Sequence, residues 1–147
     1  MTEKVFSLAK NLIDACGTRN PREICRELNI SVVFTDLPES IDGFYMESGE
    51  RQAVIVKNGM DPIKSDFCLA HELGHALMHK GINNFFISEN TNMPLGRFER
   101  EADLFAAALL IDISDPDFIA DSQKIGEAFG VPQYILDVYF SEICKTN

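Results

Sequence analysis

Residues 67–79 read Phe67-Cys68-Leu69-Ala70-His71-Glu72-Leu73-Gly74-His75-Ala76-Leu77-Met78-His79, and their apolar pattern predicts a helix. Residues four apart on a helix face the same way, so His71 and His75 can reach one metal ion. Zinc accepts neutral imidazole nitrogens at about 2.0–2.1 Å, and this spacing allows both contacts without bending the helix. Glu72 is rotated away from the two ligands, so its carboxylate can face the attacking water. The spacing is typical of zinc hydrolases, although a buried helix with ordinary histidines is the competing interpretation.

A catalytic zinc site needs a third protein ligand, and histidine cannot supply it here. The third histidine, His79, lies eight residues beyond His71. That spacing is about 12 Å along a helix axis, so all three rings cannot meet at one ion. We expect His79 to be a helix-end residue that interacts with the last carbonyl groups. A carboxylate from elsewhere in the chain must complete the site.

Residues 98–107, Phe-Glu-Arg-Glu-Ala-Asp-Leu-Phe-Ala-Ala, offer that carboxylate. Glu99 and Asp103 are four apart and therefore share one face of a helix. We predict that Glu99 is the third metal ligand and that Asp103 accepts the outer N–H of a ligating histidine. Glu101 lies about 200° round the helix from Glu99 and is the alternative ligand. A solvated acidic face is the plainer interpretation, but the apolar neighbours of these acids weaken it.

Length and charge limit the possible functions. The chain has 147 residues, 46% of them hydrophobic, and carries a net charge of −10. We expect one domain over residues 1–147, in which 113–147 form a C-terminal helical extension. Because 23 acidic residues outnumber 13 basic ones, we do not expect direct nucleic-acid binding. An acidic surface suits a basic protein partner, or serves only solubility.

Cysteine usage and hydropathy indicate a cytoplasmic protein. The four cysteines (Cys16, Cys25, Cys68 and Cys144) are scattered without a CxxC pair, so we interpret them as reduced thiols. No apolar run approaches the roughly 20 residues that span a bilayer. The first residues are too polar for a signal peptide. We therefore expect neither a membrane segment nor export.

The remaining pattern predicts helices and a small sheet. Helices are expected over 3–15, from Asn20-Pro21 to about Leu28, over 97–111, from Asp115-Pro116 and from Val131-Pro132. Strands are expected over 30–35, 43–46 and 53–56, with a hairpin turn within 47–51. These strands predict a three-stranded, largely antiparallel sheet in an α+β fold. Residues 81–94 are interpreted as a loop or lid beside the site.

Two motifs together resemble the ImmA/IrrE family of metallo-endopeptidases. They are His71-Glu72-Leu73-Gly74-His75 and Glu99-x-x-Ala102-Asp103-x-Phe105-Ala106-Ala107-x-Leu109-Leu110. The strands at 43–45 and 54–56 and the lead-in Phe67-x-Leu69-Ala70 add to the likeness, which covers roughly residues 20–112. The family usually continues Leu-Leu-Met-Pro where this chain has Leu-Leu-Ile111-Asp112, and more often has asparagine where Asp103 stands.

The resemblance implies a zincin-like, thermolysin-like core in which a sheet edge borders the cleft of one zinc ion. Better-known members of the family cleave helix-turn-helix repressors that silence mobile elements, prophages or stress genes. We therefore expect a zinc-dependent endopeptidase that cuts such a repressor at a specific site. Glu72 would act as the base, with zinc on His71, His75 and Glu99. The sequence does not identify the residue that stabilises the oxyanion. Tyr45 is one candidate, although a core tyrosine is the favoured interpretation, and Tyr134, Tyr139 and Arg97 are weaker candidates.

Two other functions compete with this one. A non-catalytic, zinc-containing anti-repressor could capture a regulator by binding alone, but such a binder has no use for the base Glu72. Residues 125–132 resemble part of a helix-turn-helix, which suggests a DNA-binding regulator. Only Lys124 and Lys145 are basic within 113–147, too few for that role.

Overall fold

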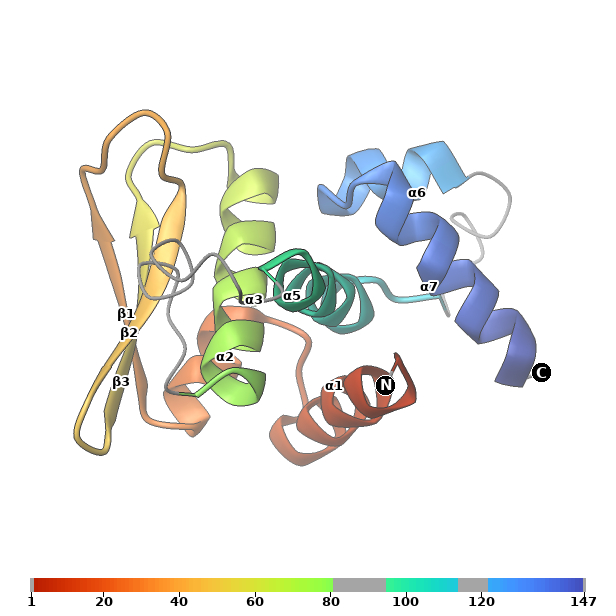
Figure 1. Ribbon diagram of the computed structural model, residues 1–147, viewed down its shortest axis with the longest axis horizontal. Coiled ribbons are helices and arrows are strands. Elements are labelled where there is room, and N and C mark those ends of the chain that lie inside the picture. The colour runs from red at the N-terminus through yellow and green to blue at the C-terminus, as the bar shows by residue number, and fades with distance from the viewer. Residues whose placement is uncertain (1, 81–94, 114–121, 147) are drawn as a thin grey trace.

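The computed structural model describes residues 2–80, 95–113 and 122–146 of the chain (Figure 1). In chain order the elements are α1 (Thr2–Cys16), α2 (Pro21–Glu27), β1 (Ile30–Thr35), β2 (Gly43–Ser48), β3 (Arg51–Lys57), α3 (Pro62–Met78), α5 (Leu95–Leu110), α6 (Ser122–Phe129) and α7 (Gln133–Thr146). The fold is α+β, as expected. The loop expected over 81–94 and the start of the helix expected at Asp115-Pro116 lie outside the described residues.

The sheet is mixed rather than largely antiparallel. Its strand order is β1-β3-β2, with β2 antiparallel and β1 parallel to the central strand β3. The antiparallel pair follows from the hairpin turn at Gly49 and Glu50, where Gly49 has a φ of 64°. The parallel pair is a non-local contact, because β2 and its hairpin separate β1 from β3 in the chain.

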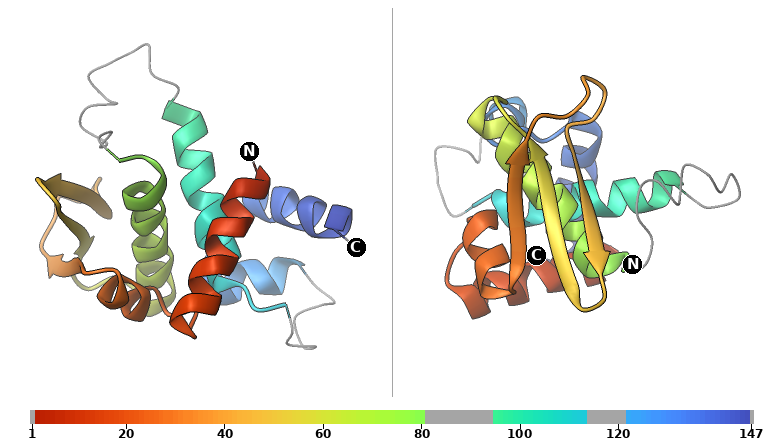
Figure 2. Two further views of the ribbon diagram at one scale, coloured as in Figure 1. Left: turned by 90° about the horizontal axis from the view of Figure 1, so that it is seen from below. Right: turned by 90° about the vertical axis from the view of Figure 1, so that its left-hand side faces the viewer.

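Helix α3 lies between the sheet and α5 (Figures 1 and 2). Asp61 caps its first turn, since the Asp61 side chain accepts from the backbone N–H of Ile63, and Pro62 follows at the first helical position. Leu69, Ala70 and Leu73 of α3 are fully or almost fully buried. A helix packed on two sides holds its side chains rigidly, which is what a precise site requires.

The approach of α5 to α3 depends on Gly74. A Cβ at this position would lie 2.9 Å from Cδ1 of Phe105, a fully buried ring of α5. Real Cβ atoms do not tolerate that distance, so only glycine allows the two helices to pack this closely. Because the two helices lie this close, the acidic side chains of α5 can reach the histidines of α3.

Helices α1 and α7 also pack against α5, on the side away from the sheet (Figure 1). The loop after α1 contributes Arg19, whose guanidinium donates to the carbonyl oxygens of Ala108, Leu109 and Ile111 at the end of α5. These carbonyls have no intrahelical partners, and the positive charge also suits the helix C-terminus. Among the described helices, none is long and apolar enough to cross a membrane.

Candidate metal centre

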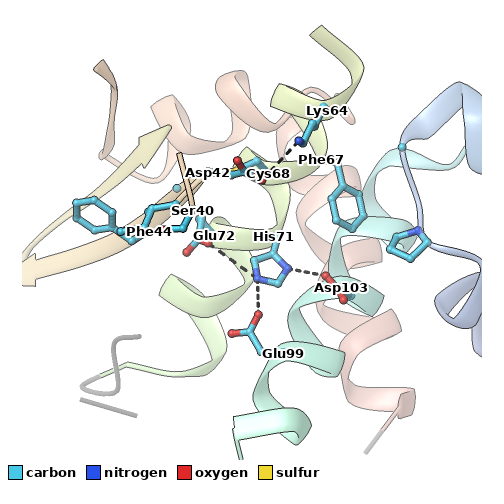
Figure 3. Close-up of a pocket in the computed structure, with 14 residues that line it drawn as sticks. Ser40, Asp42, Phe44, Lys64, Phe67, Cys68, His71, Glu72, Glu99 and Asp103 are labelled. Carbon is cyan, nitrogen blue, oxygen red and sulfur yellow. Dashed lines mark hydrogen bonds and ion pairs between the residues drawn. The ribbon is translucent and has the colours of Figure 1, made fainter. Parts of the chain in front are cut away.

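The side chains of His71, His75 and Glu99 converge in the space between α3 and α5, and Figure 3 shows two of them, His71 and Glu99. The Nε2 atoms of His71 and His75 are 3.2 Å apart. Glu99 reaches both, with Oε2 3.1 Å from Nε2 of His71 and Oε1 3.0 Å from Nε2 of His75. Among the described residues, this trio is the one group of histidine, cysteine and acidic side chains gathered closely enough to hold a metal ion.

The spacing of these donor atoms fits zinc. Two ligands of a tetrahedral ion at about 2.0–2.1 Å lie about 3.3 Å from each other. The observed separations of 3.0–3.2 Å are close to that value. Two imidazole nitrogens and one glutamate are also a donor set found in catalytic zinc sites, where a fourth position stays open. The residues present therefore fit the metal that the motif predicts.

Glu72 lies beside the cluster, on the same helix (Figure 3). The residue is 4% exposed, and its Oε1 lies 3.9 Å from Nε2 of His71. The other oxygen, Oε2, is buried and has no hydrogen-bond partner among the described residues. A buried carboxylate oxygen without a partner is unfavourable unless a water or an ion meets it. Burial raises the pKa of Glu72, although the nearby His71 and His75 act in the opposite direction.

The second ring nitrogen of His71, Nδ1, contacts the carboxylate of Asp103. This nitrogen lies 2.7 Å from Oδ1 of Asp103, and Oδ2 of Asp103 accepts a hydrogen bond from the hydroxyl of Tyr134 on α7. Burial disfavours protonation of His71, but its hydrogen bonds to Asp103 and Glu99 outweigh this and raise its pKa to about 10. Burial also opposes ionisation of Glu99, yet its hydrogen bonds to the two histidines lower its pKa overall. The metal-free centre therefore holds a proton that a metal would displace.

The surroundings of His79 differ from the sequence prediction. We expected this ring to interact with the last carbonyls of the helix, but Nδ1 of His79 lies 2.8 Å from Nδ1 of His75. Its Nε2 lies 3.3 Å from Oε2 of Glu101, and Oε1 of Glu101 accepts from Nε of Arg97 at 3.1 Å. Burial lowers the pKa of His79, and Glu101 opposes this shift. Glu101, the alternative ligand, is thus paired with His79.

A cavity of about 580 Å³ opens at the cluster. The edge strand β2 borders it at Gly43 and Phe44, and residues just before α7 lie on the opposite side. Around the polar centre the lining is mixed: apolar side chains include Ile41, Phe44, Phe67 and Pro132, and polar ones are Ser40, Asp42 and Lys64. The volume is in the range of a site for a small ligand or a short stretch of peptide.

Sequence similarity to known proteins identifies the family of this chain. Residues 25–137, more than half of the chain, match the model of the Peptidase_M78 family, described as the IrrE N-terminal-like domain. The chain belongs to this family. It is 31% identical over 120 residues to an "Uncharacterized immunity region protein 2" of Bacillus phage phi105, covering 82% of this chain and 73% of that protein. It is 26% identical over 140 residues to "Metallopeptidase ImmA" of Bacillus subtilis strain 168, covering 91% and 82%.

Membership confirms the resemblance to the ImmA/IrrE family, and it implies a metal ion for which the cluster of His71, His75 and Glu99 is suited. The matched region includes Tyr134, which the sequence offered only as a weak candidate for oxyanion stabilisation. No local pattern predicts that its hydroxyl meets Asp103. His79 carried a usable signal, because its spacing of four from His75 puts the two rings on one helix face.

Tyr45, one candidate for stabilising the oxyanion, is 2% exposed, and its hydroxyl donates to the carbonyl oxygen of His79 at 2.5 Å. This contact ties β2 to the end of α3 and favours a core role for Tyr45. Tyr139 is also buried, and its ring stacks on Phe6 of α1. Neither tyrosine lines the cavity.

Proposed function

We propose that the protein is a zinc-dependent endopeptidase that cleaves a protein substrate at a specific site, with His71, His75 and Glu99 as the metal ligands. The observation that carries this proposal is the buried Oε2 of Glu72, which has no hydrogen-bond partner in the described part of the chain and lies beside three convergent donor atoms. A purely structural metal site would be closed and would have no use for a buried base. Family membership and the cavity at the cluster support the same reaction class.

When bound, zinc would polarise the scissile carbonyl group and lower the pKa of the attacking water. Glu72 accepts a proton from that water and later delivers it to the leaving amine, which keeps the proton balance of peptide hydrolysis. Glu99 brings a negative charge to the ligand set. Asp103 accepts the outer N–H of His71, which fixes the ring with Nε2 towards the metal. Tyr134 holds Asp103 in place through its hydroxyl.

We further propose that the substrate is a helix-turn-helix repressor of a mobile element, prophage or stress regulon. The phage relative is named for an immunity region, which supports this class of partner. The net charge of −10 suits a basic DNA-binding protein through electrostatic steering. Such a substrate would place the protein in the cytoplasm, and the four free thiols agree with a reducing compartment.

We propose that residues 113–147 belong to the same domain as the metal centre. The contact between Tyr134 and Asp103 and the packing of α7 against α5 support this assignment. The competing function, an anti-repressor that captures its target without cutting, leaves the buried carboxylate of Glu72 unexplained.

The test mixes the zinc-loaded protein with the helix-turn-helix regulator encoded nearest to it and follows intact masses over time. Glu72→Gln keeps the shape of the side chain but removes the base, so we expect one zinc per chain and a cleavage rate about 10²–10⁴-fold lower. Glu50→Gln, the same change at an exposed turn position, is the matched control and should cut at the wild-type rate.

Two new fragments with wild type and the control, and none with Glu72→Gln, would support the endopeptidase. Undiminished cutting by Glu72→Gln would overturn the role of Glu72. An uncut complex formed equally by all three proteins would favour capture instead.

A further inference from the structure

We infer that His79 is a positioning residue for the metal centre: it holds His75 in the tautomer that presents Nε2 to the metal, and Glu101 holds His79 in turn. The inference rests on the proposed metal site. It adds a line of contacts outside the ligands, which we call an outer arm. The geometry that carries it is a continuous line of contacts from His75 through His79 to Glu101 and Arg97.

The two ring nitrogens of His75 contact different groups. Nε2 lies 3.0 Å from Glu99 and 3.2 Å from Nε2 of His71, so it belongs to the cluster of donor atoms. Nδ1 lies 2.8 Å from Nδ1 of His79. A nitrogen that binds a metal must offer its lone pair, so a neutral His75 that binds through Nε2 carries its proton on Nδ1.

This tautomer of His75 determines which ring nitrogen of His79 accepts a hydrogen bond and which donates one. Because Nδ1 of His75 donates, Nδ1 of His79 must accept, and a neutral His79 then carries its proton on Nε2. That N–H points to Oε2 of Glu101 at 3.3 Å, while Oε1 of Glu101 accepts from Nε of Arg97 at 3.1 Å. Each contact has one donor and one acceptor, so the line is consistent from Arg97 to the metal site.

Burial makes this arrangement consequential. His75 is 1% exposed and His79 is 4% exposed, so water cannot easily replace a lost partner for Nδ1 of His75. The ring of His79 also packs on Phe98 with centroids 4.6 Å apart. Its backbone N–H donates to the carbonyl oxygen of His75. A ring fixed in this way can hold the orientation of its neighbour.

The two metal-binding histidines thus have different outer partners. Asp103 contacts His71 directly with a carboxylate, whereas His75 meets a neutral imidazole, and the carboxylate of Glu101 stands one residue further out. Both arms connect α3 to α5, so each ties a ligand of one helix to the helix that supplies Glu99. The plain alternative is that His79 only fills space at the end of α3.

Two substitutions separate these roles. His79→Phe keeps a planar ring of similar size but removes the acceptor for His75, and we expect zinc affinity to fall about 10–100-fold. His79→Asn places an amide oxygen near the position of Nδ1, so it should retain affinity within about threefold of wild type. The measurement is competition for zinc against a chelator, with thermal unfolding of each metal-free variant as the measure of folding.

Tyr45→Phe is the matched control. It removes a hydrogen bond to the backbone of the same residue but leaves the line of ring contacts intact. We expect this variant to unfold at a lower temperature and to bind zinc as wild type does. The control therefore separates loss of stability from loss of positioning.

A second measurement needs no variant. Nitrogen-15 NMR of histidine side chains in the zinc-loaded wild-type protein reports which ring nitrogen carries each proton. We expect the proton on Nδ1 of His75 and on Nε2 of His79. A proton on Nδ1 of His79, or a doubly protonated His79, would overturn the inference even if His79→Phe does not fold.

The outcomes also separate the inference from the function on which it rests. A wild-type protein that binds no zinc would overturn the proposed metal centre and the inference with it. Tight binding by wild type and equally tight binding by His79→Phe would overturn the inference alone. Equal losses in His79→Phe and His79→Asn would show that the acceptor is not what matters, and would overturn it as well.

Discussion

His71 shows how one residue links the metal site to pH. In the metal-free protein its hydrogen bonds to Asp103 and Glu99 outweigh burial and raise its pKa to about 10, so it holds a proton at neutral pH. A metal needs the lone pair of this ring, so binding must displace that proton. The same two acids that orient the ring therefore make zinc binding compete with protonation.

The expected consequence is a rise in apparent zinc affinity with pH. Below pH 10, raising the pH removes the competing proton, so one displaced proton gives about a tenfold gain per pH unit. Calorimetric titration in buffers of different ionisation enthalpy would count the protons released near pH 7. An affinity that stays constant between pH 6 and 8 would contradict the raised pKa of His71.

Residue-scale prediction worked best where chemistry depends on spacing along one helix. The pairs His71/His75 and Glu99/Asp103 were expected to share a face because they are four apart, and the structure places each pair as expected. Helix geometry also led us to prefer Glu99 to Glu101 as the metal ligand, and in the structure Glu101 contacts His79. The contact of His79 with Glu101 joins two helices, so the sequence alone did not show it.

At the scale of elements, the contact between α3 and α5 decides whether the ligands meet. Gly74 brings the helices together, and Phe105 fills the space where a side chain at 74 would stand. The proposed ligand Glu99 comes from α5, and the other two proposed ligands, His71 and His75, come from α3. A small shift of one helix would therefore move a ligand relative to the other two.

Gly74→Ala tests this dependence. The added methyl group raises helix propensity by about 1 kcal/mol, but overpacking against Phe105 costs about 1–3 kcal/mol. We expect a net loss of stability and weaker zinc binding, measured by denaturant unfolding and chelator competition. Gly96→Ala in α5 is the matched control, since its Cβ would lie 3.4 Å from the flexible Arg100 side chain. Equal behaviour of the two variants would refute the close-packing role of Gly74.

Local signals located most elements but not their pairing. The cap at Asn20 and the glycine turn between β2 and β3 are local features, and the structure contains both. The parallel pairing of β1 with β3 was missed. It depends on how the sheet packs on α3 and α2, and the strand sequences carry no sign of it.

At the scale of the whole molecule, the proposed centre connects segments that are far apart in the chain. Its ligands come from α3 and α5, and Tyr134 of α7 supports Asp103 from behind. A metal bound only by the folded arrangement stabilises that arrangement, because the unfolded chain has no preformed site. Metal content should therefore affect unfolding of the whole described fold.

We expect zinc to raise the melting temperature markedly. At a free zinc concentration about 1,000 times the dissociation constant, binding contributes about 4 kcal/mol, or roughly 8–16 °C for a chain of this size. Scanning calorimetry with zinc and with a chelator would measure the shift. Magnesium, which prefers oxygen ligands, should leave the melting temperature near that of the chelated protein. An equal shift with magnesium would contradict a nitrogen-rich site.

The sequence alone determined the parts of this protein that depend on short-range geometry. These are the two histidines and Glu72 on one helix, the acids on a second helix, and the family to which both motifs point. The tertiary structure decided what depends on contacts between helices and strands: the pairing of β1 with β3, the contact of Tyr134 with Asp103, and the contact of His79 with Glu101. Helix periodicity can be recognised from residues that are close in the sequence. Packing brings together side chains that are far apart in the sequence, and no local pattern predicts those contacts.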